Sequence, residues 1–431
     1  MIPIIRAAET DRRTIFLRDD PMEDVAAPVR AILDRVRAEG DAALKAYTKE
    51  FDGADIATVE LPFGAIDEGF RAADPVLVEV LYRAAERISA FHQHQLRNSF
   101  LLNDEPGIVM GQKVLPLDRV GLYVPGGTAA YPSSVLMNAI PAKLAGVREV
   151  VMVTPPGKNG KIPPNILAAA RICGVDRVFR VGGAQAIAAL AYGTESVPRV
   201  DKIVGPGNQY VAEAKKQVFG RVGIDMVAGP SEILIVADAG ANAQVVAADL
   251  LSQAEHDRNA TAVLVTDSAA LAEAVRDALE EQIPKLPRQE IARASIEHNG
   301  KIIVAEDLET GIDIANELAP EHLELCVAAP FDWLDKVRNA GSVFLGYQCP
   351  EALGDYFAGP NHTLPTGGTA RFSSPLSVDD FVKKMQYTYY TRSALSVARE
   401  SVSHFAKKEG LFAHARSVDI RFDPAVVKEE K

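Results

Sequence analysis

The feature that most constrains the fold is the regular alternation of short apolar runs with helical patterns along most of the 431 residues. In the first half, four runs have the character of β-strands: Val120–Val124, Val150–Thr154, Arg177–Val181 and Lys202–Val204. Each run leads through Gly, Pro or Ser into a segment predicted to be helical: Ser133–Leu144, Asn165–Cys173, Ala184–Ala191 and Tyr210–Val218. Strands that are apolar along their whole length need cover on both faces, so the pattern predicts a parallel sheet with helices on either side.

A second series follows, with strand-like runs at Ile233–Ala237, Thr261–Thr266, Lys301–Ala305, Leu323–Val327 and Val343–Leu345. Helical patterns lie between these runs, including one that ends at Gln253 and one over Ala269–Ile283. Two such series predict two open α/β domains. The alternation stops after Ser377, where helices are expected over Val378–Met385 and Ser393–Lys407. The end of the chain is therefore predicted to be a small, separate helical unit.

Charge and cysteine content narrow the class of protein. The chain has 46 Lys and Arg residues against 58 Asp and Glu residues, and a net charge of −12 argues against a nucleic-acid or anionic-membrane partner. No segment resembles a signal peptide or approaches the roughly 18 apolar residues of a membrane span. Cys173, Cys326 and Cys349 are odd in number and widely spaced, so we expect free thiols and a cytoplasmic protein.

Polar residues close an otherwise apolar helix at Gln253-Ala254-Glu255-His256. Gln253 and His256 are three positions apart and share one helix face. They are expected to project toward the tips of a parallel sheet, at the edge where open α/β sheets bind ligands. Imidazole is a common zinc ligand and a side-chain amide an uncommon one. The alternative interpretation is a solvated helix end.

Two further polar segments could handle protons or bind a metal. Glu321 and His322 directly precede a predicted strand, and a partly buried Glu beside a His supplies two proton-transfer groups near neutral pH. The alternative for this pair is a surface turn. Asp355 lies in a polar, Gly-containing loop, where functional residues concentrate in α/β proteins. His362 follows in the same loop and is predicted to support a ligand residue more than to be one.

Glycine-rich turns stand between strand and helix at three places: Tyr123-Val124-Pro125-Gly126-Gly127, Val181-Gly182-Gly183-Ala184-Gln185 and Gly205-Pro206-Gly207-Asn208. Backbone amides and a helix N-terminus at such turns suit a phosphate group. None matches the dinucleotide-binding fingerprint, and tight turns need glycine in any case. Three in one half of the chain nevertheless favour a nucleotide ligand.

Eight motifs occur together in one order: Gly121-Leu-Tyr-Val-Pro-Gly-Gly127, Val181-Gly-Gly-Ala-Gln-Ala-Ile187, Gly205-Pro-Gly-Asn208, Ala228-Gly-Pro-Ser-Glu232, Leu251-Ser-Gln-Ala-Glu-His256, Pro320-Glu-His-Leu323, Gly354-Asp-Tyr356 and Asn361-His-Thr-Leu-Pro-Thr366. In order and spacing they resemble the histidinol dehydrogenase family, from about residue 25 to residue 416. The resemblance implies a zinc- and NAD-dependent enzyme that oxidises L-histidinol to L-histidine through histidinaldehyde with two NAD, the last step of histidine biosynthesis.

The resemblance also implies roles for individual residues. The zinc ligands, with one ion per subunit, would be Gln253, His256, Asp355 and His414, and the proton acceptors would be Glu321 and His322. Substrate contacts would come from Ser231 and Glu409 together with His322 and the zinc ligands, and NAD contacts from Tyr123, Gln185 and Asn208. The family is homodimeric, and Glu409 and His414 would reach the site of the partner subunit.

Combined with the strand pattern, the resemblance predicts two incomplete Rossmann-like domains. The expected division is an N-terminal arm (1–22), a larger α/β domain with most of the zinc site (23–118 with 233–374), an NAD-binding domain (119–232) and a helical C-terminal domain exchanged in the dimer (375–431). Three alternatives stay open: a zinc- and NAD-dependent dehydrogenase of another small polar alcohol, a zinc hydrolase in which Glu321 activates water, and a non-catalytic binding protein.

Overall fold

The computed structural model describes residues 1–10, 25–126 and 131–427. The rest of the predicted N-terminal arm, 11–22, lies outside the described residues, as does Gly127. The chain divides into two compact units, Met1–Leu96 with Leu117–Phe381, and Arg97–Pro116 with Val382–Lys431. We call them the larger and the smaller unit and describe each by itself.

A five-stranded parallel sheet forms one half of the larger unit, in the order β6-β5-β4-β7-β8. Its strands are β4 (Arg119–Tyr123), β5 (Glu149–Thr154), β6 (Arg177–Arg180), β7 (Lys202–Val204) and β8 (Gly223–Ile224). The helices between them are α6 (Pro132–Leu144), α7 (Pro164–Cys173), α8 (Gly183–Tyr192) and α9 (Gln209–Val218). The first strand stands in the middle, as in half of a dinucleotide-binding fold, so the predicted Rossmann-like series is confirmed.

Four helices near the N-terminus pack against the helices of this same half: α2 (Ala26–Glu39), α3 (Asp41–Phe51), α4 (Ala65–Ala72) and α5 (Pro75–Gln93). Leu33 of α2 shares a core with Phe179 of β6, and Ile88 of α5 shares a core with Val120 of β4. The prediction that 23–118 joins the larger α/β domain was therefore wrong. Periodicity identifies an apolar helix face, but it does not say which of two sheets that face will cover.

A six-stranded parallel sheet forms the other half, in the order β1-β11-β10-β9-β12-β13. Its strands are β1 (Ile4–Arg6), β9 (Glu232–Ala237), β10 (Thr261–Thr266), β11 (Lys301–Val304), β12 (His322–Cys326) and β13 (Ser342–Leu345). Its helices are α10 (Ala243–Ala254), α11 (Ala269–Gln282), α12 (Gln289–His298), α13 (Leu308–Leu318), α14 (Phe331–Leu334) and α15 (Glu351–Tyr356). The predicted second series is confirmed, and the start of the predicted arm is an edge strand of this sheet.

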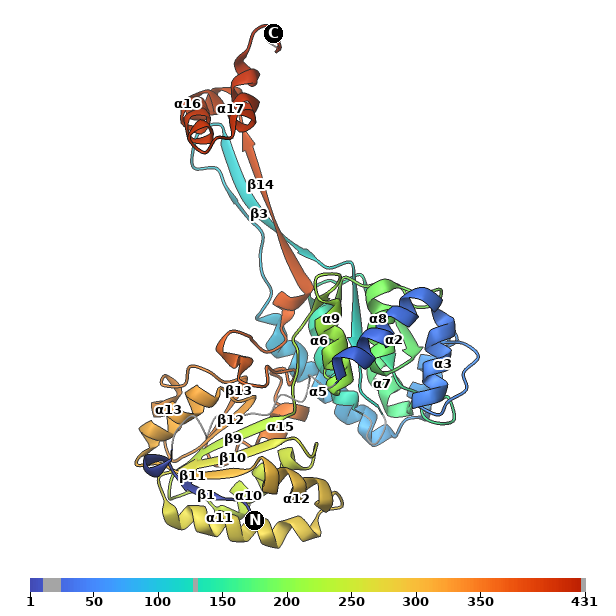
Figure 1. Cartoon of the computed structure of the whole chain (residues 1–431), viewed down its shortest axis with the longest axis vertical. Coiled ribbons are helices and arrows are strands. Elements are labelled where there is room, and N and C mark those ends of the chain that lie inside the picture. Colours follow the sequence, from blue (N-terminus) through green and yellow to red (C-terminus); the bar gives the residue numbers. More distant parts are fainter. Residues whose placement is uncertain (11–24, 127–130, 428–431) are drawn as a thin grey trace. The chain divides into compact units, whose positions relative to one another are not determined.

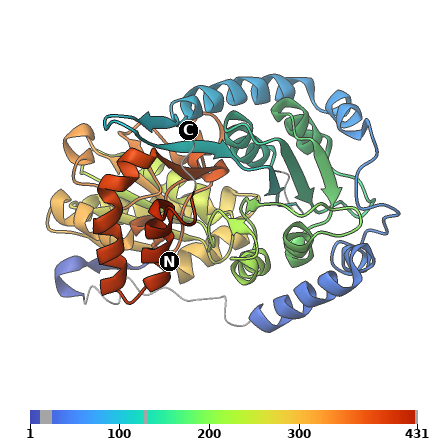
Figure 2. The same cartoon turned by 90° about the horizontal axis from the view of Figure 1, so that it is seen from above.

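The smaller unit has an antiparallel sheet and a helical pair. β2 (Phe100–Leu102), β3 (Ile108–Pro116) and β14 (Val382–Tyr390) form the sheet, in the order β14-β3-β2. Helices α16 (Arg392–Lys408) and α17 (Phe412–Asp419) pack against each other (Figures 1 and 2). The prediction of a helix over Ser393–Lys407 is confirmed.

The predicted helix over Val378–Met385 was wrong, because a 3₁₀ turn, Val378–Phe381, is followed there by β14. The β-forming residues Tyr387, Tyr389 and Tyr390 continue this strand, and all nine of its residues pair with β3. The C-terminal unit is therefore not wholly helical, and it also includes residues 97–116.

Two expectations from composition can be compared with the structure. In the part of the chain that it describes, no helix is both long enough and apolar enough to cross a membrane. Cys173, Cys326 and Cys349 are free thiols, as predicted.

Candidate active site

A cleft of about 1210 Å³ in the larger unit is lined by residues from both parallel sheets. The five-stranded sheet contributes Pro125 and the Gly205–Asn208 turn, which follow the carboxyl ends of β4 and β7. The six-stranded sheet contributes Ser231 and His322, which stand at the amino ends of β9 and β12.

The polar residues of the larger sheet thus lie at the edge opposite to the one expected. Ligands of open α/β sheets gather at the carboxyl ends of strands. Gln253 and His256 close α10, however, and that helix follows β9 and runs back to the start of β10. A helix that returns antiparallel to its strands ends at their amino ends. Both residues line the cleft, so the interpretation as a solvated helix end was wrong.

Glu321 and His322 are both held by the backbone of a single residue of β9, Glu232. The N–H of Glu232 donates to Oε2 of Glu321 at 2.9 Å, and the carbonyl of Glu232 is 3.0 Å from Nδ1 of His322. Nδ1 of His322 lies 3.6 Å from Oε2 of Glu321, and both side chains are buried. The pair is therefore a fixed, desolvated acid–base unit, and the alternative of a surface turn was wrong.

The turn that delivers this pair has an unusual backbone. Ala319 ends α13 with φ 48°, the one non-glycine residue with positive φ in the described chain. This left-handed conformation costs an L-residue about 1–2 kcal/mol. Pro320 follows, and its carbonyl accepts from the N–H of Gly341 at 2.9 Å. Local strain at this point directs the chain into β12 with Glu321 turned toward β9.

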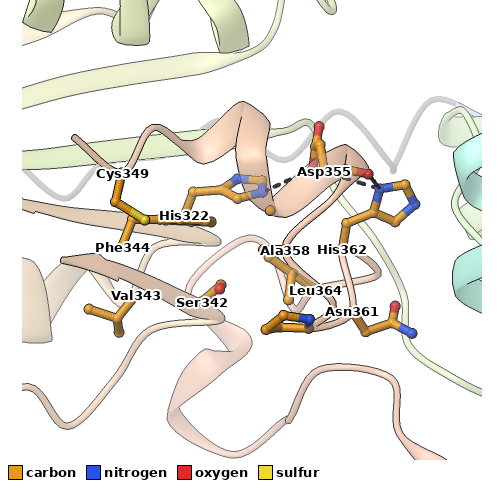
Figure 3. A pocket seen from close by; sticks show the side chains of 12 residues that line it. His322, Ser342, Val343, Phe344, Cys349, Asp355, Ala358, Asn361, His362 and Leu364 are labelled. Atoms are coloured by element: carbon orange, nitrogen blue, oxygen red, sulfur yellow. Dashed lines mark hydrogen bonds and ion pairs between the residues drawn. The ribbon is translucent and has the colours of Figure 1, made fainter. Parts of the chain in front are cut away.

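Asp355 lies between two imidazole rings (Figure 3). Its Oδ1 is 3.8 Å from Nε2 of His322 and 3.7 Å from Nδ1 of His362. Nδ1 of His362 is also 3.1 Å from the backbone carbonyl of Asp355, which fixes that ring beside the carboxylate. A smaller pocket of about 170 Å³ lies against these side chains. Asp355 is one turn into α15, where Gly354 allows close packing because a Cβ there would meet the ring of Phe344.

Burial and charge shift the pKa values in this cluster. Burial raises the pKa of Glu321 to about 8. Burial lowers the pKa of His322, but the carboxylates of Glu321 and Asp355 outweigh it and raise that pKa to about 10. Burial lowers the pKa of His256, which favours the neutral imidazole that binds metals. Burial opposes ionisation of Asp355, yet the three neighbouring histidines lower its pKa.

The residues of the cleft fit a divalent cation. Among the described residues, Oε1 of Gln253 and Nε2 of His322 and of His362 are buried without a hydrogen-bond partner. Buried polar atoms normally have hydrogen-bond partners, so these unpartnered atoms are candidates to bind a metal ion. Ligand atoms of His322, Glu351 and Asp355 lie within 4.8 Å of one another. Amide oxygen, imidazole and carboxylate are all donors that zinc accepts.

The Gly205–Asn208 turn is held from beneath by a buried ion pair. The side chains of Lys215 and Asp225 are 2% and 1% exposed and contact each other. Nζ of Lys215 donates to the carbonyl of Gly205 at 3.0 Å, and the N–H of Gly205 donates to Oδ2 of Asp225 at 2.7 Å. Gly205 has φ 117°, and a Cβ there would collide with the carbonyl of Tyr123. The turn is thereby fixed at the N-terminus of α9.

Comparison with known proteins agrees with this geometry. A sequence model of the histidinol dehydrogenase family matches residues 18–422. The chain belongs to the histidinol dehydrogenase family. It is accordingly an NAD-dependent oxidoreductase, and the reaction of its family is the oxidation of histidinol.

Individual relatives are similar over nearly their whole length. A histidinol dehydrogenase from Syntrophotalea carbinolica is 56% identical over 405 residues, 94% of each chain. One from Streptococcus mutans is 52% identical over 400 residues, 93% of each chain. The crystal structure of histidinol dehydrogenase from Elizabethkingia anophelis superimposes with a TM-score of 0.91 at 37% identity, covering 97% of each chain. Membership of the family therefore includes the fold as well as the motifs.

The predicted NAD contacts of this family member occupy different environments. Asn208 caps α9 and lines the cleft, where its side chain accepts from the N–H groups of Tyr210 and Val211. Tyr123 and Gln185 are buried beneath the glycine-rich turns, and the hydroxyl of Tyr123 accepts from the N–H of Gly183 at 3.1 Å. Neither lines the cleft as described. Their role in NAD binding stays a prediction.

The predicted substrate contacts and the fourth zinc ligand are divided between the two units. Ser231 lines the cleft. Glu409 and His414 belong to the smaller unit, at the end of α16 and on α17, and both are exposed on its surface. Their exposure leaves them available to another surface, as the resemblance implies.

Sequence reasoning missed Glu351 as a functional residue. It is 2% exposed, and its carboxylate lies beside Gln253. Glu324 and Asp249 surround it, and burial raises the pKa of Glu351, Glu324 and Asp249 to about 7, 9 and 6. One signal was available: Glu351 precedes Asp355 by four residues, a spacing that places both on one face of a helix.

Proposed function

We propose that Glu321 and His322 act as the two proton acceptors in the oxidation of L-histidinol to L-histidine through histidinaldehyde. The observation that supports this most strongly is that the backbone N–H and C=O of one residue, Glu232, contact both side chains at the edge of the cleft. Two oxidations in one site need two proton transfers of different kinds, one from an alcohol and one from water. An adjacent Glu and His provide one group for each.

His322 takes the proton of the alcohol. The carbonyl of Glu232 accepts from Nδ1, which places the ring proton on Nδ1 and the lone pair on Nε2. Nε2 is the atom without a partner, and it faces Asp355 in the cleft. In the metal-loaded protein, added positive charge among the carboxylates lowers the pKa of His322, so that the ring is neutral and can accept a proton.

Glu321 takes a proton from the water that attacks the aldehyde. A general base is most effective when its pKa is near the working pH. The pKa of about 8 places this buried carboxyl in that range. The N–H of Glu232 holds Oε2, so Oε1 is the oxygen available to the water.

Gln253, His256, Asp355 and His414 of a second copy would hold the zinc ion. When bound, zinc supplies Lewis-acid polarisation and a fixed template for the amino alcohol. Three of these residues line one cleft. Ser231, His322 and Glu409 of the second copy would complete the contacts to the substrate, and correct orientation contributes much of the rate.

NAD would lie along the turns of the five-stranded sheet and accept a hydride in each oxidation. Asn208 caps the N-terminus of α9, and Asp225 fixes the backbone N–H of Gly205 in the preceding turn. A helix N-terminus of this kind suits a pyrophosphate. Tyr123 and Gln185 lie beneath the adjacent turns. In this proposal the nucleotide and the metal ligands would share one cleft.

One assay tests the reaction: formation of NADH from L-histidinol by the purified protein, with and without a zinc chelator. We expect activity, its loss with chelator and its return with added zinc. A zinc hydrolase would form no NADH, and activity that survives complete zinc removal would contradict the proposed metal site.

The exchange of residues between copies can be tested by refolding together two variants that are expected not to complete the reaction, Glu321→Gln and His414→Ala, and measuring the formation of histidine. If His414 serves the partner subunit, one site in each mixed dimer has both normal residues, so activity returns. If His414 serves its own chain, every site in the mixed dimer stays defective and no activity returns.

A further inference from the structure

The side-chain amide of Gln253 has one donor end and one acceptor end, and only the oxygen can bind a metal. The side chain is 0% exposed, so its orientation is decided by protein contacts. Nε2 donates to Oε1 of Glu351 at 2.9 Å, while Oε1 has no hydrogen-bond partner among the described residues. The orientation seen here therefore leaves the metal-binding atom free.

Another contact favours the opposite orientation. Nδ1 of His322 is 3.1 Å from Nε2 of Gln253 and 3.0 Å from the carbonyl of Glu232. With its proton directed to that carbonyl, Nδ1–H faces the NH₂ group of Gln253, and two donors gain nothing from each other. A reversed amide would place its oxygen beside Nδ1–H and its NH₂ group toward the metal. Glu351 opposes this reversal, because a carboxylate can only accept.

Both oxygens of Glu351 already have partners. Oε1 accepts from Gln253, and Oε2 accepts from the hydroxyl of Ser252 at 2.5 Å. The backbone N–H of Glu351 donates to Oε1 of Glu324 at 2.7 Å, which fixes the first residue of α15. The same short helix presents Asp355 one turn later. The geometric cluster with His322 and Asp355 would suggest a metal ligand, but these contacts engage the carboxylate with protein donors.

We propose that Glu351 is a positioning residue that holds the Gln253 carboxamide with its oxygen toward the zinc ion. This inference rests on the proposed zinc site. Partners of this kind commonly change metal affinity by about 10–100-fold when removed. Glu351 would thus fix the orientation in which the amide of Gln253, an uncommon zinc ligand, can bind the ion through its oxygen.

Zinc affinity measured by competition with a chromophoric chelator tests this role without reference to activity. Glu351→Ala should weaken zinc binding by about 10–100-fold. Glu351→Gln keeps an oxygen that accepts from Nε2 of Gln253, and it should stay within about threefold of the unmodified protein. If Glu351→Gln loses as much affinity as Glu351→Ala, the negative charge acts on the metal directly and the proposal is wrong. Full affinity in Glu351→Ala would also overturn it.

Repeating the measurement in a Gln253→Glu variant distinguishes the proposed role from local unfolding of α15. Gln253→Glu supplies a ligand with an oxygen at either end, which needs no orientation. In that background Glu351→Ala should cause no further loss of zinc affinity, and the two changes should be non-additive. An equal loss in both backgrounds would mean that Glu351→Ala acts by damaging the fold, and would overturn the proposal. Absence of zinc binding in the unmodified protein would instead refute the proposed metal site itself.

Discussion

Apart from the additional edge strand β1, the two parallel sheets of the larger unit have the same strand order, but they meet the cleft at opposite edges. Each places its first strand, β4 or β9, beside its fourth, β7 or β12, the arrangement that opens a crevice at a switch of direction. The five-stranded sheet meets the cleft at its carboxyl edge and the six-stranded sheet at its amino edge. Strand order thus predicts that a crevice exists, whereas the positions of the polar side chains determine at which edge the candidate active site lies.

Buried charges are also compensated differently at the two edges. At the five-stranded sheet, Lys215 and Asp225 neutralise each other and bind the backbone carbonyl and the N–H of Gly205. At the six-stranded sheet, burial raises the pKa values of Glu321, Glu324 and Glu351, and nearby polar atoms lack partners. The buried charges of the first edge compensate each other, whereas we expect an added cation to stabilise those of the second.

The largest expected effect is on the reactive edge. Glu321→Gln removes the proposed base for water and should slow oxidation of histidinaldehyde by about 10²–10⁴-fold, with a much smaller effect on oxidation of histidinol. Single-turnover formation of NADH from each substrate measures the two steps separately. Glu255→Gln, which removes a neighbouring carboxylate at the end of α10, is the matched control. Equal losses in both steps would refute the separate roles of Glu321 and His322.

At the other edge, the main effect should be on stability. Lys215→Met leaves Asp225 buried and unpaired and should lower the free energy of unfolding by about 3–5 kcal/mol. Denaturant titration measures this loss, and Lys215→Met with Asp225→Leu should recover part of it. Zinc affinity should stay unchanged in both variants. A loss below about 1 kcal/mol would show that the ion pair does not hold the turn.

The contrast in buried charge predicts a pH effect in the metal-free protein. Unfolded Glu has a pKa of about 4.3, whereas Glu351, Glu321 and Glu324 have folded pKa values of about 7, 8 and 9. Groups with raised pKa stabilise the fold while protonated, and that stabilisation is lost as pH rises through the folded pKa. The free energy of unfolding should therefore begin to fall near the unfolded pKa of about 4.3 and continue to fall until about pH 9.

Urea denaturation in the presence of chelator, at several pH values, measures this fall. Glu324→Gln should make the curve less steep up to about pH 9, because one carboxyl that keeps its proton in the folded protein and loses it on unfolding has been removed. Zinc should reduce the fall, because a cation stabilises the ionised carboxylates. Stability that rises with pH in the metal-free protein would contradict the assignment of raised pKa values.

The smallest expected effect distinguishes a helix cap from a nucleotide contact. Asn208→Ala removes the cap of α9 and should cost about 1 kcal/mol of stability, while also raising the KM for NAD. Ser268→Ala removes the comparable cap of α11 and serves as the control. It should cost a similar free energy without changing the KM for NAD. An equal rise of KM in both variants would show that Asn208 acts only through stability.

Much of the architecture was readable from local sequence. The apolar runs at Val150–Thr154 and Thr261–Thr266 are strands because nothing but a buried sheet accommodates them. The Glu321-His322 and Gln253–His256 segments stood out because polar groups interrupted apolar patterns. These features depend on neighbours a few residues away, which a single sequence displays.

Other features were decided only when distant segments met. The positions of α2 and α5 depend on the distant core residues with which they pack. Residues 382–390 form a strand because all of them pair with β3. Gln253 and His256, two of the candidate zinc ligands, lie at the amino edge because α10 returns its last turn to it. Glu351 gained its position through contacts with Ser252 and Gln253, about a hundred residues earlier. These features depend on packing and on buried hydrogen bonds between residues that are remote in sequence, and local periodicity contains no information about either.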